Sequence, residues 1–225
     1  MKGLIETPSP NHGVRAKDAA IDILVVHYTG MASASAALRR LCDPAAKLSA
    51  HYLIDEDGTI HRLVAEERRA WHAGVASWRG VTDVNSASIG IELVNPGHEF
   101  GYRSFAEQQM AAFQGLATEI IARHAILARN IVGHSDVAPC RKSDPGEFFD
   151  WRGLAEAGIG LWPHLAEHLE VEPQRIVEML AGFGYDTGDA AAAIKAFQRH
   201  FRPARVNGRI DPETARLLAG LLEIL

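Results

Sequence analysis

Residues 21–27 read IDILVVH, and this stretch decides the fold that the sequence predicts. A short run of β-branched and apolar residues is typical of a buried strand, which here ends at His27. Residues 88–94, SIGIELV, form a second apolar run with a single acidic interruption, Glu92. We therefore expect two buried strands, the first ending at His27 and the second interrupted by Glu92.

A hairpin is expected between these two strands. Residues 51–54 (HYLI) and 59–64 (TIHRLV) flank the sequence DEDG at 55–58, which is a turn signal. The two flanking runs therefore predict a pair of antiparallel strands.

A long helix is expected after the second apolar strand. Ser104 and Glu107 have the spacing of a capping box, so we expect a helix from this point to about His124. Its apolar residues recur at helical spacing, at Phe105, Phe113, Leu116, Ile120 and Ile121. Strands that alternate with helices predict an α/β fold with a mixed central sheet flanked by helices.

The composition changes after Trp162 and Pro163, where strand-like segments end. Three short helices are expected, at 174–181, 190–201 and 212–224. Asp211 would cap the last helix, with Pro212 in its first turn. We therefore predict one domain over 1–165 and a small three-helix domain over 170–225.

The overall composition excludes several classes of protein. The 225 residues include 23 basic and 28 acidic side chains, a net charge of −5, and no basic cluster long enough to follow phosphates. We therefore expect no nucleic-acid partner. No run of about 18 apolar residues occurs, so no transmembrane segment is expected. The two cysteines, Cys42 and Cys140, are expected to be reduced thiols.

The first twenty residues bear on location. They contain Glu6, Pro8, Pro10 and His12 where a signal peptide requires an unbroken apolar stretch. We therefore expect a cytoplasmic protein. The alternative, if a leader has been removed, is a periplasmic or outer-membrane location.

One segment matches a zinc-peptidase pattern. Residues 164–168 read HLAEH, and two histidines four residues apart lie on one face of a helix. The segment lies between Pro163 and Pro173, which leaves room for a short helix only, and no neighbouring segment offers a third ligand. We expect a linking helix with Leu165 and Leu169 on its buried face.

A second candidate metal site draws on separate segments. His27 ends a predicted strand, and the segment 132–146 (VGHSDVAPCRKSDPG) places His134 after another short strand and Asp144 ten residues later. Two imidazoles and one carboxylate are a common ligand set for catalytic zinc. Glu92 strengthens the case, because a buried carboxylate needs a partner or a function.

Several motifs together resemble one enzyme family. The chain is similar to the zinc-dependent N-acetylmuramoyl-L-alanine amidases that are related to peptidoglycan recognition proteins, over most of residues 21–163. The motifs that carry the resemblance are VVHYTG, WHAG, NSASIGIELVNPG, GHSDVAP and RKSDPG.

The resemblance implies a role for each of the central residues. His27, His134 and Asp144 would bind Zn²⁺. Glu92 would accept a proton from water and deliver it to the leaving amine, and Lys142 would stabilise the oxyanion. Residues expected to contact substrate, or alternatively to pack in the walls of the cleft, are Tyr28, Thr29, His51, Trp71, His72 and Asn85.

The implied reaction is hydrolysis of the amide bond between the lactyl group of N-acetylmuramic acid and L-Ala. The substrate would be peptidoglycan or a muropeptide, and the sequence leaves open whether it is a recycled anhydro-muropeptide or the polymeric wall. Two alternatives are a recognition module that binds peptidoglycan without cutting it, and an exported lytic cell-wall amidase. We expect a monomer.

The tail is similar to a small helical peptidoglycan-binding domain, chiefly over AIKAFQRHFRPARVNGRIDPETARLL at 193–218. In the branch of the family that has such a tail, the enzymes are outer-membrane lipoproteins, whereas this sequence predicts no leader. We expect the tail to hold glycan without touching the chemistry. A chain that ends near residue 168 would then keep its activity on small muropeptides.

Overall fold

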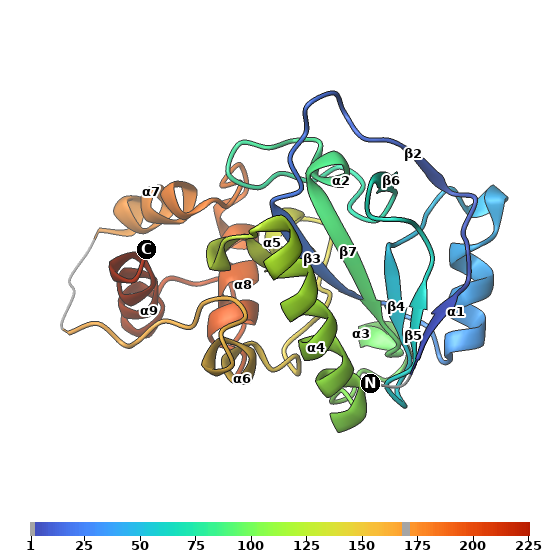
Figure 1. Ribbon diagram of the computed structural model, residues 1–225. Coiled ribbons are helices and arrows are strands. Elements are labelled where there is room, and N and C mark those ends of the chain that lie inside the picture. Colours follow the sequence, from blue (N-terminus) through green and yellow to red (C-terminus); the bar gives the residue numbers. More distant parts are fainter. Residues whose placement is uncertain (1–2, 168–171) are drawn as a thin grey trace.

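The structure, a computed structural model, describes residues 3–167 and 172–225. Its centre is a mixed six-stranded sheet in the order β1-β5-β4-β7-β3-β8 (Figure 1). The strands are β1 (Leu4–Glu6), β3 (Ile23–Tyr28), β4 (Tyr52–Ile54), β5 (Ile60–Arg62), β7 (Ser88–Leu93) and β8 (Ile131–Gly133). Strands β2 (His12–Val14) and β6 (Arg68–Ala70) form a separate antiparallel pair.

Four adjacent strands, β4, β7, β3 and the edge strand β8, run parallel to one another. Strand β5 pairs antiparallel with β4, as the turn at 55–58 predicts, and β1 pairs parallel with β5. The mixed sheet expected from the sequence is therefore confirmed, and the expected hairpin is present.

Helices cover both faces of the sheet. One face packs against α4 (Glu107–His124), which runs beside β7 in Figure 1, and against α6 (Trp151–Glu156). The opposite face packs against α1 (Ala34–Leu41) near β4 and against the C-terminal helices near β3 and β8. Shorter helices are η1 (Pro44–Ala46), α2 (Val84–Ala87), α3 (Gly97–Phe100), η2 (Ala128–Asn130) and α5 (His134–Val137).

Helix α4 begins later than the sequence predicts. Its N-cap is Ala106, which has no side chain to accept a capping hydrogen bond, so the predicted Ser104–Glu107 capping box is wrong. Tertiary contacts keep the preceding residues out of the helix: Asn95 Nδ2 donates to the carbonyl of Arg103 at 2.8 Å. Phe105 packs edge-on against the ring of Phe149. Packing has therefore overridden a local helix signal.

The C-terminal part is helical, as expected. It contains α7 (Pro173–Phe183), α8 (Ala190–Phe201) and α9 (Pro212–Glu223). The Asp211 side chain accepts from the backbone N–H of Thr214 and caps α9, with Pro212 at the first position. We call residues 172–225 the helical unit.

The helical unit shares a hydrophobic core with the sheet. Val25 of β3 and Val132 of β8 lie in the same buried cluster as Ile176, Leu180 and Phe197. Because this cluster is continuous, the boundary between 1–165 and 170–225 is a boundary in sequence composition but not in the core. The shared core argues against a tail that is independent of the rest of the molecule.

The segment HLAEH differs from its expected structure. Residues 164–167 are not helical, and Leu165 is 48% exposed, whereas Ala166 is buried. His164 Nε2 forms an ion pair with Glu223 Oε2 at 2.7 Å. The expected linking helix is therefore wrong over these residues, and His168 and Leu169 lie outside the described part of the chain.

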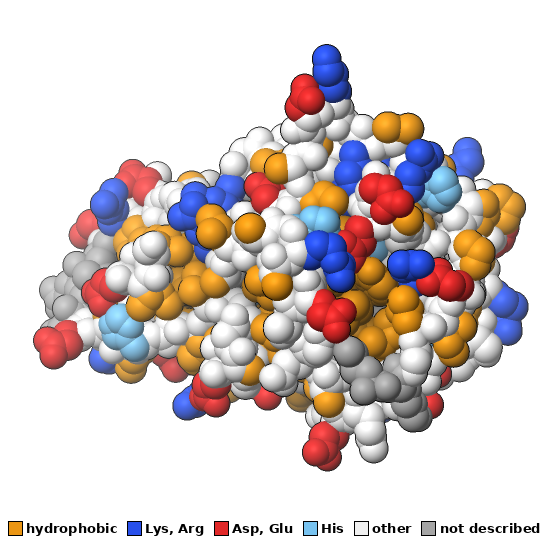
Figure 2. Space-filling view, in the orientation of Figure 1, with side chains coloured by type: hydrophobic (Ala, Val, Ile, Leu, Met, Phe, Trp, Pro, Cys, Tyr) orange, Lys and Arg blue, Asp and Glu red, His pale blue; other side chains and the backbone are white. Residues whose placement is uncertain are grey.

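Among the helices that the structure describes, none combines the length and the apolar character needed to cross a bilayer. Basic and acidic side chains intermingle on the face that Figure 2 shows, and hydrophobic side chains gather over the helical unit.

Ending the chain after Glu167 should lower the free energy of unfolding by at least about 3 kcal/mol, because it uncovers buried residues such as Val132 and Val137. Urea unfolding, followed by tryptophan fluorescence in the full chain and in residues 1–167, measures the difference. A full chain with two separate transitions, one of which coincides with that of 1–167, would instead identify an independent domain.

Candidate active site

Three potential metal ligands converge at the carboxyl ends of the parallel strands. His27 is the penultimate residue of β3, His134 begins α5 directly after β8, and Asp144 lies on the loop that follows. The two Nδ1 atoms are 2.9 Å apart, and Asp144 Oδ2 lies 3.1 Å from His27 Nδ1 and 3.0 Å from His134 Nδ1. All three side chains are buried.

The spacing of these atoms suits a tetrahedral metal. Zinc bonds of about 2.0–2.2 Å at tetrahedral angles would separate the ligand atoms by about 3.3–3.6 Å, so a few tenths of an ångström of adjustment is enough. Two imidazoles and one carboxylate leave a fourth position for water or substrate. The three residues therefore fit the metal that the sequence resemblance implies.

The outer ring nitrogens of both histidines also fit metal binding. His27 Nε2 lies 3.0 Å from His72 Nδ1, and His134 Nε2 lies 3.1 Å from the carbonyl of Ala73. When each outer nitrogen carries the proton and donates it, each Nδ1 has a free lone pair directed at the other two ligands. Metal-binding histidines commonly show this pattern of outer hydrogen bonds.

His72 continues the hydrogen-bond chain away from the ligands. With Nδ1 accepting from His27, His72 Nε2 donates to Ser88 Oγ at 3.1 Å, and that hydroxyl donates to the carbonyl of Val84 at 2.6 Å. The His72 ring can lie flat on β7 because residue 90 is glycine. A Cβ there would approach the ring to 2.4 Å.

The electrostatics of the cluster favour a neutral His27 and an ionised Asp144. Burial, the neighbouring His134 and Lys142 together lower the pKa of His27 to about 4, against the opposing effect of Asp144. Burial alone would raise the pKa of Asp144, but its interactions with His134 and His27 hold that pKa far below its usual range. These are the protonation states that bind a metal cation.

Glu92 lies beside the cluster on the same face of the sheet. It is the direct partner of His27 in the parallel register of β3 and β7, so both side chains lie on the same face of the sheet. Its Oε2 is buried and has no hydrogen-bond partner among the described residues. Burial raises the pKa of Glu92 well above its usual value, the charge of Asp144 adds to the rise, and Lys142 opposes it.

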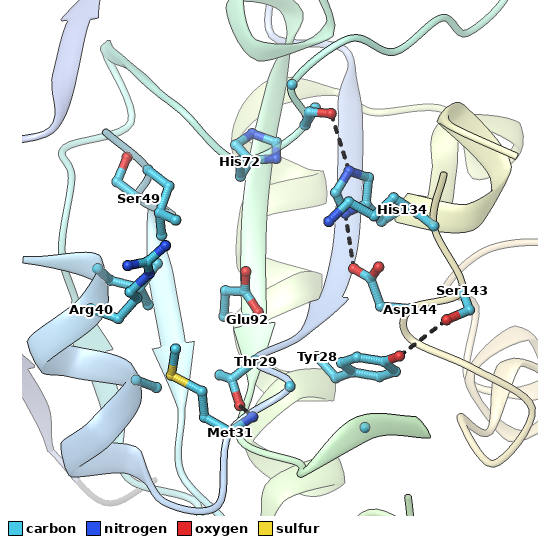
Figure 3. Close-up of a pocket in the computed structure, with 18 of the residues that line it drawn as sticks. Tyr28, Thr29, Met31, Arg40, Ser49, His72, Glu92, His134, Ser143 and Asp144 are labelled. Atoms are coloured by element: carbon cyan, nitrogen blue, oxygen red, sulfur yellow. Dashed lines mark hydrogen bonds and ion pairs between the residues drawn. The ribbon is translucent and has the colours of Figure 1, made fainter. Parts of the chain in front are cut away.

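These groups lie in a cleft of about 610 Å³. Figure 3 shows Glu92 between a wall formed by Arg40 and Ser49 and a wall formed by His134 and Asp144. Lys142 also lines the cleft, and its side chain is exposed. The cleft therefore brings all five residues expected to carry the chemistry to one place, with His27 buried beneath its surface.

Five of the six residues expected to contact substrate line the cleft: Tyr28, Thr29, Trp71, His72 and Asn85. Tyr28 Oη lies 2.9 Å from His98 Nδ1 and 3.1 Å from Ser143 Oγ. Thr29 Oγ1 donates to the carbonyl of Asn95.

Asn85 has a visible structural role in addition to its place in the cleft. Its Oδ1 accepts from the backbone N–H groups of His72 and Ala73 at 3.0 and 2.9 Å. It therefore fixes the segment that supplies hydrogen-bond acceptors to both ligand histidines.

His51 is the exception, and its assignment as a substrate contact needs correction. It is fully buried and lies outside the lining of the cleft. Its Nδ1 accepts from the N–H of Gly90 at 2.9 Å, and its Nε2 lies 3.1 Å from the carbonyl of Arg68. The imidazole therefore joins β7 to the segment at β6, behind the cleft, and acts as a structural residue.

Several cleft residues were missed by the sequence analysis. Arg40, Lys47, His98, Arg141 and Ser143 line the cleft, and none of them was predicted from the sequence to have a role in the site. His98, expected to be an ordinary residue, also pairs with Glu147 at 2.8 Å. The available signals were weak: the turn NPG places His98 just after β7, and Arg141 and Ser143 flank Lys142.

Comparison with known proteins identifies the family. The family model described as N-acetylmuramoyl-L-alanine amidase matches residues 17–147. The chain belongs to the N-acetylmuramoyl-L-alanine amidase family. The enzyme class expected from the sequence is thereby confirmed. The chain is 38% identical to the N-acetylmuramoyl-L-alanine amidase AmiD of Escherichia coli, over 99% of this chain and 91% of AmiD.

Solved structures of this amidase family also match the fold. The complex of E. coli AmiD with the substrate anhydro-N-acetylmuramic acid-L-Ala-D-gamma-Glu-L-Lys matches with a TM-score of 0.83, over 93% of this chain and 92% of that one. AMPDH3 of Pseudomonas aeruginosa in complex with anhydromuramic pentapeptide matches with a TM-score of 0.83 at 35% identity, over 93% of this chain and 94% of that one.

The buried, neutral His51 should make stability depend on pH. Burial and the charge of Arg15 lower its pKa to about 3, whereas an unfolded histidine titrates near 6.5. Between these values only the unfolded chain binds this proton, so stability falls as the pH falls. The stability that His51 contributes should therefore be about 1–2 kcal/mol smaller at pH 5 than at pH 7.

Urea unfolding of the parent and of His51→Asn at both pH values, with a chelator present throughout, measures this change. Asparagine retains an acceptor for Gly90 but does not titrate. If the free energies of unfolding of parent and variant differ by the same amount at pH 7 and pH 5, His51 is not the buried, neutral histidine that the structure shows.

Proposed function

We propose that this amidase is zinc-dependent and hydrolyses the amide bond between the lactyl group of N-acetylmuramic acid and L-Ala of a muropeptide. One observation carries the proposal. Ligand atoms of His27, His134 and Asp144 lie within 2.9–3.1 Å of one another beside the carboxylate of Glu92, one buried oxygen of which has no hydrogen-bond partner in the described part of the chain.

Zinc, when bound by these three side chains, supplies a Lewis acid that lowers the pKa of a bound water to about 7. Glu92 is suited to take the proton of the attacking water, because its raised pKa makes it a stronger base than an ordinary carboxylate. The same side chain then delivers the proton to the nitrogen of the leaving L-Ala. The unpartnered Oε2 is the atom available for both transfers.

Lys142 is suited to stabilise negative charge on the substrate carbonyl oxygen. It lines the cleft two residues before Asp144 and acts electrostatically on both His27 and Glu92. A cation close to the reacting carbonyl stabilises the transition state more than the neutral ground state.

An anionic muropeptide fits the charge of the cleft. Arg40 and Lys47 line one side of it and Lys142 the other. The ligand seen with AmiD contains a γ-linked Glu, whose α-carboxylate remains free. Both relatives compared above hold anhydro-muramic ligands, which supports a recycled anhydro-muropeptide as the substrate of this chain.

Two other functions are less well supported. A recognition module without catalysis would not need a complete ligand set beside a general base. A role on polymeric wall depends on glycan binding by the helical unit, for which the sequence resemblance of residues 193–218 is the argument. The domain division, the monomeric state and the cytoplasmic location stay predictions.

Purified protein should contain about one zinc per chain, and His134→Ala should lose it, because two ligands hold zinc far more weakly than three. Metal analysis after exhaustive dialysis measures the stoichiometry. The matched control is His164→Ala, an exposed histidine paired with Glu223, which should keep its zinc. If His134→Ala keeps its zinc and His164→Ala loses it, the zinc ligands lie in the HLAEH segment instead.

Glu92→Gln should reduce kcat on an anhydro-muropeptide by about 10²–10⁴-fold, because the amide keeps the shape but cannot accept the proton. Zinc content should stay at the parental level. Glu119→Gln, an exposed carboxylate on α4, is the control for loss of one negative charge. Turnover of Glu92→Gln close to that of the control would leave Glu92 with a structural role only.

A further inference from the structure

The loop that carries His134 and Asp144 is held at both ends by one helix of the helical unit. His200 and Arg199 are consecutive residues near the end of α8. His200 Nδ1 bonds to Asp136 Oδ2 at 2.7 Å, two residues after His134. Arg199 Nε donates to Glu147 Oε1 at 2.9 Å, three residues after Asp144.

The Asp136 carboxylate is the centre of the first contact. It is 1% exposed and accepts three hydrogen bonds. Its Oδ2 accepts from the N–H of Gly133 at 2.7 Å and from His200, and its Oδ1 accepts from Tyr185 Oη at 2.8 Å. A buried carboxylate is costly unless it is hydrogen-bonded, so the two donors from the helical unit fix where Asp136 and the start of α5 lie.

Packing prevents these two donors from turning away. The His200 ring is stacked on Trp151 and Phe201, with ring centroids 3.9 and 4.0 Å apart. The Tyr185 ring packs edge-on against Trp78. Both side chains are buried, so the hydrogen bonds to Asp136 have fixed directions.

The second contact extends to the cleft. Glu147, held by Arg199, also pairs with His98 Nε2 at 2.8 Å. His98 Nδ1 lies 2.9 Å from Tyr28 Oη, which is 3.1 Å from Ser143 Oγ. Ser143 directly precedes Asp144, so this chain of contacts runs from α8 to the carboxylate ligand.

We propose that His200, Tyr185 and Arg199 are positioning residues, through which the helical unit sets the spacing of His134 and Asp144. The inference rests on the proposed zinc site and adds residues that lie outside the segment matched by the family model, which ends at 147. The helical unit is then a part of the catalytic apparatus, although none of these three residues lines the cleft.

The physical effect is preorganisation. A loop already fixed at both ends loses little conformational freedom when its two ligands bind zinc, so binding is tighter than it would be with a mobile loop. Loss of outer contacts to metal ligands typically weakens metal binding about 10–100-fold. Because Asp136 acts through the backbone beside His134, the lower end of that range is expected.

The main test compares three variants of α8 in the full chain. His200→Phe keeps the ring stacked on Trp151 and removes the donor, so the zinc Kd should rise about tenfold. His200→Asn places Nδ2 near the position of Nδ1 and should restore most of the affinity. The matched control is Gln198→Met. Gln198 is buried on the same helix, but its hydrogen bonds stay within the helical unit, to Arg209 and Thr214.

Competition with a chromophoric chelator measures zinc Kd for all three variants and the parent. Equal affinities in parent and His200→Phe, or equal weakening in His200→Phe and Gln198→Met, would overturn the inference and leave the proposed zinc site intact. A parent that binds no zinc would instead refute the proposed function. Tyr185→Phe removes a single hydroxyl and serves as the second variant if His200→Phe does not fold.

Hydrogen exchange in metal-free protein tests the positioning independently of zinc. Backbone amides of residues 134–147 should exchange faster in His200→Phe and in Arg199→Met than in Gln198→Met. The same rate in all three variants would show that α8 does not hold the loop, whatever the metal content.

Discussion

The parallel pairing of β3 with β7 is the constraint on which the site depends. Side chains alternate between the two faces of each strand, so Leu24, Val26 and their counterparts in β7 are buried against α4. The same alternation directs His27 and Glu92 to the opposite face, in direct register. A shift of β7 by one residue in this register would turn Glu92 away from His27 and bury it against α4. The hydrophobic packing that stabilises the sheet therefore also places one metal ligand beside the general base.

The remaining ligands depend on contacts between distant segments. His134 and Asp144 come from a loop, which has no ladder of its own to fix it. The outer hydrogen bonds of the two histidines end on the segment at 72–73, which Asn85 holds in turn. Metal affinity and the free energy of folding are coupled through these contacts, because the same hydrogen bonds serve both.

The sequence predicted β3, β4, β5, β7, the hairpin and the C-terminal helices, because periodicity is a local property, and motif order pointed to candidate ligands that the fold brings together. The sequence-based predictions failed for features that tertiary contacts determine. Packing of Phe105 replaces the predicted capping box at Ser104. His51, which was expected to contact substrate, is buried outside the lining of the cleft. The pairing of Asp136 with His200 spans 64 residues and leaves no local pattern in either segment. Motifs identify which residues are important more readily than which face they occupy.

The shared core also changes how a glycan-binding role of the helical unit would work. A domain on a flexible linker raises the local concentration of substrate without preference for its orientation. The helical unit is instead fixed against β3 and β8 by buried residues such as Val25, Val132 and Phe197. Glycan bound to a unit fixed in this way would be presented to the cleft in one orientation. Its contribution would then depend on the distance and angle between the bound sugar and the scissile bond. The enzyme would therefore distinguish polymers of different strand geometry. A short muropeptide that occupies only the cleft would not be subject to this selection.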